Sequence, residues 1–313
     1  MLKYVGRRFV YMVPTLFAIS IVAFAIIQLP PGDFLTTFVT RLEAQGEQVD
    51  PAMLEGLRQR YGLGEPIHAQ YTKWITGILF HGDFGESFEY GRSVASLVAD
   101  RLPWSMALTI FALVFTWVVA FPIGLYSAVR QYSFGDYLAT TIGFLGLAIP
   151  NFMLALAMMY IAYSVFGLST SGISPLTLGI AVVVLGTSGT AGMIRILRAN
   201  LLDELKKPYV VAARARGVSE NMLVVKYPVR MALNPFVSTV GWVLPGLVGG
   251  EVIVAQVLNL PTTGPLLFGA LRSQDMYLAG SIILIISVLT VIGTLLSDIL
   301  LAWLDPRVRL GYR

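Results

Sequence analysis

The sequence predicts an all-α integral membrane protein, and three observations lead to that prediction. Hydrophobic residues make up 56% of the 313-residue chain and charged residues only 13%, whereas soluble proteins average about 25% charged residues. The uncharged residues gather in runs that supply the roughly 20 residues a helix needs to cross the hydrocarbon core. The basic residues between these runs collect on one side. The lipid bilayer is therefore the first partner that the sequence indicates.

Six membrane-spanning helices follow from the positions of the uncharged runs. The run 137–194 is too long for one helix, and residues 167–175 (GLSTSGISP) divide it into two spans with a turn between them. Residues 259–265 (NLPTTGP) end a later span and leave residues 261–271, which are too few to cross and are expected to form a re-entrant or interfacial piece. The expected helices cover residues 9–30, 104–129, 137–166, 176–197, 235–258 and 277–304.

The charges of the loops predict that both termini lie in the cytoplasm, because Lys and Arg are retained on that side of the membrane. Basic residues precede the first helix and follow the second, fourth and sixth, which places all of them on one side. The other side receives residues 32–101, which carry ten acidic and six basic residues. We expect one transmembrane domain, residues 1–313, with an extracytoplasmic insertion at 33–101 and a cytoplasmic loop at 198–234.

The extracytoplasmic insertion is longer than a turn requires. Residues 51–63 (PAMLEGLRQRYGL) are expected to form a helix, with Pro51 near its start and Gly62 near its end. The insertion alone is too small and too polar to bury a large core. We therefore expect it to pack on the helix ends or on a partner outside the membrane.

The cytoplasmic loop has the pattern of two short helices joined by a glycine. Pro208 suits the first position of a helix, where its missing N–H costs nothing. Gly217 suits the left-handed residue that ends a helix, and Ser219 suits the N-cap of the next one. Basic residues that only set topology would not need this capped pair of helices, whereas a docking surface would. The expected small face consists of Ala212, Ala213 and Ala215, with the charges of Arg214 and Arg216 beside it.

A resemblance to a known family begins at the same loop. The stretch YVVAARARG, residues 209–217, resembles the E-A-A-x-x-x-G signature of permease subunits of binding-protein-dependent ABC importers, and more narrowly their dipeptide, oligopeptide and nickel branch. Six further stretches resemble this branch and occur in the same order. They are RRFVYMVPTL (7–16), PPGD (30–33), HGDFGESF (81–88), GEVIVAQVLNLPTTGPLL (250–267), SQDMYLAG (273–280) and LDPRVRL (304–310).

Two positions depart from the pattern of the family. Val211 stands where the signature begins with Glu, a residue that is often absent in this branch. Ala255 stands where many peptide permeases carry an acidic residue, and the nearest acid, Glu251, lies one turn earlier. Peptides are the expected cargo, with oligosaccharides, opines or nickel as the alternatives that the branch also includes.

The resemblance implies the fold of a type I ABC importer permease in the bacterial cytoplasmic (inner) membrane. It implies three kinds of partner: a second homologous permease subunit, two cytoplasmic ATPase subunits and an extracytoplasmic substrate-binding protein. It implies no contact with nucleic acid. ATP and magnesium would be bound by the ATPases, so this chain would carry no cofactor of its own. The loop would couple to the ATPase through Tyr209, Ala212, Ala213, Arg214, Ala215, Arg216, Gly217, Val218 and Ser219.

Enzymatic activity is not expected in this chain. It has no cysteine, only two histidines, and no G-x-x-x-x-G-K-[ST] motif that would bind ATP, so neither a metal site nor an ATPase site is predicted. A membrane-embedded enzyme would need a catalytic cluster in the spans, for which only Glu251 and Asp298 are available. A secondary transporter or channel would predict internal repeats with paired broken helices, and the sequence shows no such repeat.

Polar residues inside the expected spans are candidates for the substrate pathway or for a gate. Glu251 is costly there, at least about 2.5 kcal/mol on insertion scales, so it is expected either to face a cavity or to be paired with a neighbouring helix. Asn151 follows Pro150 and marks a kink that either lines a pathway or serves packing. Asp298, Arg195 and Arg198 lie near the inner ends of their helices and are expected to form a structural ion pair or a cytoplasmic gate.

Two further patterns concern the packing of the helices. Gly186, Gly189 and Gly192 recur at a spacing of three and predict close contact with another helix. Trp104 and Trp303 fall at expected helix ends and are typical of anchors at the membrane surface.

Overall fold

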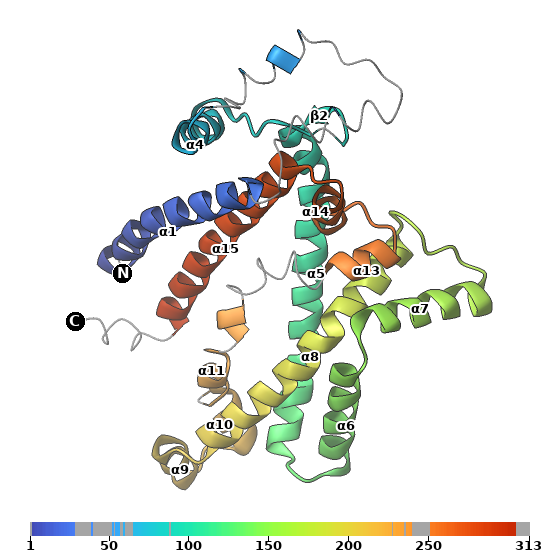
Figure 1. Cartoon of the computed structure of the whole chain (residues 1–313). Helices are drawn as coiled ribbons and strands as arrows, with labels where there is room; N and C mark the ends of the chain where they lie inside the picture. Colours follow the sequence, from blue (N-terminus) through green and yellow to red (C-terminus); the bar gives the residue numbers. More distant parts are fainter. Residues whose placement is uncertain are drawn as a thin grey trace.

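The computed structural model of the chain describes residues 2–28, 65–87, 89–226, 228–234, 236–239 and 251–304, together with 39, 52, 54–56 and 59. This part is almost entirely helical, with one two-stranded antiparallel hairpin (Figure 1). The elements before the first long helix of the bundle are α1 Leu2–Gln28, α4 Ile67–Thr76, the π-helix η1 Gly77–His81, β1 Glu86–Ser87 and β2 Arg92–Ser93. The remaining elements are α5 Val94–Val129, α6 Phe134–Ala148, α7 Asn151–Phe166, α8 Pro175–Leu205, α9 Pro208–Ala215, α10 Glu220–Lys226, α11 Pro228–Ala232, α13 Glu251–Val257, α14 Thr263–Arg272 and α15 Met276–Leu304.

Four helices of the described residues are long and apolar enough to cross a membrane. They are Gly6–Ile26 within α1, the whole of α5, the whole of α8, and Tyr277–Trp303 within α15. Helices α6 and α7 add a fifth crossing if they form one broken span. Half of the expected span 235–258 lies outside the described residues, so the predicted number of six stays a prediction.

The expected single helix 137–166 is wrong, because the chain turns by 100° between α6 and α7. Ile149 leaves the helical conformation with φ −85° and ψ 120°. The residue before a proline is pushed out of the α region by the proline ring, and Pro150 follows. The kink predicted at Asn151 is thus a complete break, and Asn151 is the first residue of α7.

Two helices extend beyond their apolar runs. Helix α5 begins at Val94 rather than 104, where the Ser93 hydroxyl accepts the N–H of Ser96 at 3.4 Å as an N-cap. Trp104 therefore lies inside α5 instead of at its end, whereas Trp303 is exposed at the end of α15 as predicted. Helix α8 continues to Leu205 because the apolar period persists through Leu201, which is fully buried.

Helices α5 and α8 pack closely through glycine. A Cβ atom at Gly186 would lie 2.4 Å from the Phe115 ring, and one at Gly189 would lie 3.1 Å from the Thr116 hydroxyl. That hydroxyl donates to the Gly186 carbonyl at 3.2 Å. The predicted close contact is confirmed at these two glycines and is wrong at Gly192, where nothing lies within 4 Å of the position that a Cβ atom would occupy. Close approach of two backbones through small residues is a frequent way of joining helices in lipid.

Helix α1 lies beside α15 in Figure 1, and part of the insertion covers this pair at one end. Trp74 of α4 is buried with Phe24 of α1 and with Tyr277 and Leu284 of α15. The prediction that the insertion packs on helix ends is therefore confirmed for this part. The predicted helix 51–63 lies mostly outside the described residues.

Helix α14 accounts for residues 261–271, the piece too short to cross. Its residues Leu266, Leu267 and Ala270 are buried with residues of α5 and α15. Asp275, which follows α14, is also buried and caps α15 by accepting the N–H of Leu278 at 3.2 Å. The same carboxylate accepts from the Ser87 hydroxyl at 2.5 Å and from the N–H of Glu89 at 3.2 Å, which ties the hairpin to the start of α15.

Candidate coupling surface and polar residues of the helices

The turn between α9 and α10 is closed by Gly217. This residue has φ +81°, a conformation that side chains bearing a Cβ rarely adopt. The N–H of Gly217 bonds the Arg214 carbonyl at 3.0 Å, and the N–H of Val218 bonds the Ala213 carbonyl at 3.3 Å. These two bonds form the Schellman pattern that satisfies the last carbonyls of a helix. Helix α9 thus ends as predicted, and α10 begins one residue after Ser219.

We call residues 208–226, which form α9, α10 and their turn, the elbow. Its inner face is part of the same buried core as the long helices. Val210 and Leu223 of the elbow are fully buried in one cluster with Leu197 and Leu201 of α8 and with Ala128 of α5. The elbow also follows α8 after only two residues. The elbow is therefore packed against α5 and α8 and is not a loop without contacts to them.

The outer face of the elbow is small and partly apolar. Ala212 and Ala215 are exposed one turn apart, beside the exposed Val211. Ala213 is buried, so the prediction of a single face made by three alanines is wrong. The reason is helical geometry, because adjacent positions such as 212 and 213 point about 100° apart. On α10 the side chains of Met222 and Val225 are exposed as well.

The two arginines of the elbow differ in their surroundings. Arg214 pairs with Glu220 through two hydrogen bonds of 2.5 and 3.1 Å. This pairing lowers the pKa of the Glu220 carboxyl and raises the pKa of the Arg214 guanidinium. Arg216 is exposed and forms no ion pair with the described residues. Arg216 therefore places a positive charge, unpaired among the described residues, next to the outer face.

An ion pair of Arg198, with an acidic partner that the sequence did not predict, joins α6 to α8. The Arg198 guanidinium donates to both carboxylate oxygens of Asp136 at 2.9 Å each. Asp136 is buried and also accepts the N–H of Tyr132, whose φ is +65°. The pair therefore fixes the turn between α5 and α6 onto the last part of α8, just before the elbow.

Asp298 and Arg198 each form a structural ion pair, as expected, but not with each other. Asp298 of α15 pairs with Arg8 of α1 at 2.9 Å. Arg195 is exposed, and its guanidinium lies over the Phe144 ring at 5.5 Å. These residues belong to different helix pairs because α15 packs beside α1, not beside the inner half of α8.

The two pathway candidates are not brought together by the described residues. Asn151 begins α7, where it is partly exposed. Glu251 begins α13, and its side chain lies outside the described part of the chain. No three His, Asp or Glu side chains among the described residues come together to hold a metal ion.

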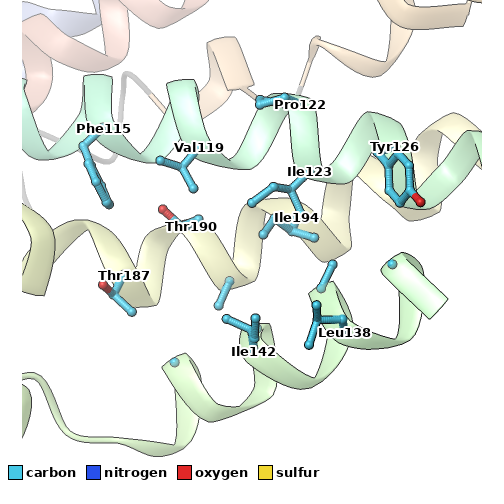
Figure 2. A pocket seen from close by; sticks show the side chains of 15 residues that line it. Phe115, Val119, Pro122, Ile123, Tyr126, Leu138, Ile142, Thr187, Thr190 and Ile194 are labelled. Atoms are coloured by element: carbon cyan, nitrogen blue, oxygen red, sulfur yellow. The ribbon is translucent and has the colours of Figure 1, made fainter.

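An apolar groove of about 510 Å³ lies between α5, α6 and α8. Figure 2 shows its walls, with Phe115, Val119 and Ile123 on α5, Leu138 and Ile142 on α6, and Thr187 and Thr190 on α8. None of its lining residues carries a charge. The sequence signal that was missed is the row of small residues on one face of α6, namely Gly135, Ala139, Gly143 and Gly146.

Similarity to known proteins extends over nearly the whole chain. Residues 120–310 match the family described as binding-protein-dependent transport system inner membrane component. Residues 1–109 match the N-terminal region of such membrane components. The chain is 34% identical to the oligopeptide transport system permease protein AppB of Bacillus subtilis, over 98% of this chain and 99% of the relative. It is 33% identical to the glutathione transport system permease protein GsiC of Escherichia coli K12, over 99% of each.

Proposed function

Because the chain belongs to the family of binding-protein-dependent transport system inner membrane components, we propose that it uses its elbow to couple a transport pathway to a cytoplasmic ATPase. The chain is a multi-pass subunit of the inner membrane and a permease of an importer. It forms half of the pathway, with a second homologous permease supplying the other half. Two ATPase subunits bind ATP and magnesium on its behalf, and a substrate-binding protein delivers the cargo from outside.

One observation carries the coupling role: the elbow has a buried face continuous with α5 and α8 and an outer face that is exposed. Val210 and Leu223 share a core with Leu197 and Leu201. A closely packed core moves as a unit, because interiors are dense and resist compression. A displacement imposed on the outer face, beside Ala212 and Ala215, therefore passes directly into the long helices.

Peptides are the proposed cargo. One relative is named for oligopeptides and another for glutathione, which is itself a small peptide. The same machinery with oligosaccharides, opines or nickel as cargo is the alternative, since Ala255 stands where many peptide permeases have an acid. The groove between α5, α6 and α8 is a poor site for a free peptide, because no lining residue can pair with its charged ends.

Glu251 and Asn151 are the proposed pathway residues, and Glu251 can be tested with an almost isosteric change. In proteoliposomes containing the assembled transporter, Glu251→Gln should lower uptake per complex while basal ATP hydrolysis persists. A charged group that contacts a charged or hydroxylated cargo loses its charge-assisted bonds on this change. Uptake equal to wild type would remove Glu251 from the pathway.

The coupling role is tested by strain at the turn of the elbow. Gly217→Val forces a β-branched residue to φ +81°, which L-residues rarely tolerate. We expect the variant to insert into the membrane but to lose cargo-stimulated ATP hydrolysis and co-purification of the ATPase. Gly167→Val is the matched control, because Gly167 ends α7 with φ +64° and also has open space around it. If equal amounts of the ATPase co-purify with both variants, the elbow is ruled out as the docking surface.

A further inference from the structure

Helix α4 crosses α1 within the part of α1 that is apolar enough to span the membrane. The hydroxyl groups of Tyr71 and Ser20 lie 2.7 Å apart, at hydrogen-bonding distance. The Phe24 ring contacts the rings of Tyr71 and Trp74, with centroids 5.5 and 5.6 Å away. Ser20 and Phe24 both lie inside the apolar segment Gly6–Ile26. In Figure 1, α4 is seen nearly end-on above α1, so it runs across that helix.

Helix α4 also contacts α15, which packs beside α1. Trp74 shares a core with Tyr277 and Leu284, which belong to the apolar segment Tyr277–Trp303 of α15. Helix α4 is thus held at the depth of two membrane-spanning segments. It cannot stand away from the bilayer as a free extracytoplasmic domain would.

Two large apolar side chains project from η1, the π-helix that directly follows α4. Leu79 and Phe80 of η1 are 68% and 77% exposed, as much as Val13 of α1, which is 65% exposed in an apolar span. Lys73 is the only Lys, Arg, Asp or Glu in the stretch 67–81, and it is neutralised by Glu65 at 2.5 Å. Side chains of this kind are unfavourable in water but stable at the boundary of headgroups and acyl chains.

We propose that α4 and η1 form an interfacial segment that inserts Leu79 and Phe80 between the lipids of the adjacent leaflet. The occupant of this apolar surface is the bilayer, because the contacts at Ser20, Phe24 and Leu284 place α4 at the level of the spans. Anchoring of this kind fixes the tilt of α1 and α15 together. Among the described residues of the outer surface, it leaves the hairpin and α14, rather than α4, free to meet a soluble partner.

The absence of cysteine from the chain allows a direct test. Leu79→Cys and Phe80→Cys are each labelled with a nitroxide in the assembled transporter, whose other subunits carry no reactive cysteine. The complex is placed in vesicles of phosphatidylethanolamine and phosphatidylglycerol. Collision rates with oxygen, which concentrates in lipid, are compared with those of a water-soluble nickel chelate. Ala95→Cys is the control, because Ala95 is exposed on the first turn of α5, between Arg92 and Asp100, which form an exposed ion pair.

The expected result is a ratio of oxygen to nickel collisions that is several-fold higher at residues 79 and 80 than at 95. A ratio equal to that of residue 95 would overturn the proposal, because both side chains would then face water. Protection from both reagents would also overturn it, since another subunit must then cover the surface. A loss of collisions only after the substrate-binding protein is added would assign the surface to that protein instead.

Discussion

The α1–α15 pair and the α5–α6–α8 group are joined in different ways. Helices α5 and α8 meet through Gly186 and Gly189, and an ion pair between the buried Asp136 and the partly exposed Arg198 holds α6 to α8. Helices α1 and α15 are joined at one end by the Arg8–Asp298 pair, and α4 covers them near the other. Among the described residues, only the first group shares its core with the elbow. If the elbow couples to an ATPase as proposed, a displacement of it would reach α5 and α8 directly through this shared core, and α1 and α15 only through other helices.

The largest effect on stability is expected at the Asp136–Arg198 ion pair of the α5–α6–α8 group. The Asp136 side chain is 4% exposed and that of Arg198 is 26% exposed, so Asp136→Ala leaves the partly buried Arg198 without this partner. Breaking a buried pair costs about 3–5 kcal/mol, and the partial exposure of Arg198 places the expected loss at about 3 kcal/mol. The measurement is the unfolding midpoint of the purified chain in detergent. Exchange of the two residues, Asp136→Arg with Arg198→Asp, should recover part of the loss, and no recovery would show that orientation rather than charge pairing matters.

Overpacking of the α5–α8 contact should have the next largest effect. Gly186→Val places methyl groups where a Cβ already lies 2.4 Å from the Phe115 ring, and such insertions cost about 1–3 kcal/mol. Gly192→Val is the matched control on the same helix, because nothing lies within 4 Å of its Cβ position. Thermal unfolding should separate the two variants clearly. Similar losses in both would mean that β-branching in α8, and not the contact with α5, is responsible.

A smaller effect is expected in the α1–α15 pair. The Asp298 side chain is 18% exposed and that of Arg8 is 34% exposed, so water and headgroups screen the pair more than they screen Asp136. Asp298→Asn should cost about 1 kcal/mol or less. Transport per assembled complex should stay near the wild-type value, because this pair is remote from the elbow. A loss of uptake as large as that caused by Asp136→Ala would contradict the distinction between the two groups.

The smallest effect is expected at the exposed pair of the elbow. Arg214 lowers the pKa of Glu220, so the pair contributes stability above the ordinary Glu pKa and loses it as the pH falls through the lowered value. Between pH 6 and 8 the difference in unfolding midpoint between wild type and Glu220→Gln should therefore be small and constant. It should vanish in acid, once Glu220 is protonated. A difference that changes between pH 6 and 8 would point to another titrating group.

Local features of the elbow were predictable because their causes lie within a few residues. Pro208 lies at the start of α9, Gly217 has φ +81° and Ser219 lies directly before α10, and each of these residue types prefers that position at a helix end. The apolar runs likewise predicted α5, α8 and α15 as spans, since the length of an uncharged segment is a property of the sequence alone. The predicted ends of the helices were less accurate. Capping by Ser93 extends α5, and burial of Leu201 extends α8, beyond the apolar run of each helix.

Pairings between distant residues were decided by tertiary structure. Arg198 meets Asp136, which lies 62 positions away, and Asp298 meets Arg8 at the opposite end of the chain. Charge and rough depth in the membrane are readable from the sequence, but the choice among several possible partners depends on which helices lie side by side. The same holds for glycine. Spacing marked Gly186, Gly189 and Gly192 alike, and only the crossing of α5 over α8 determined that the first two are in contact and the third is not.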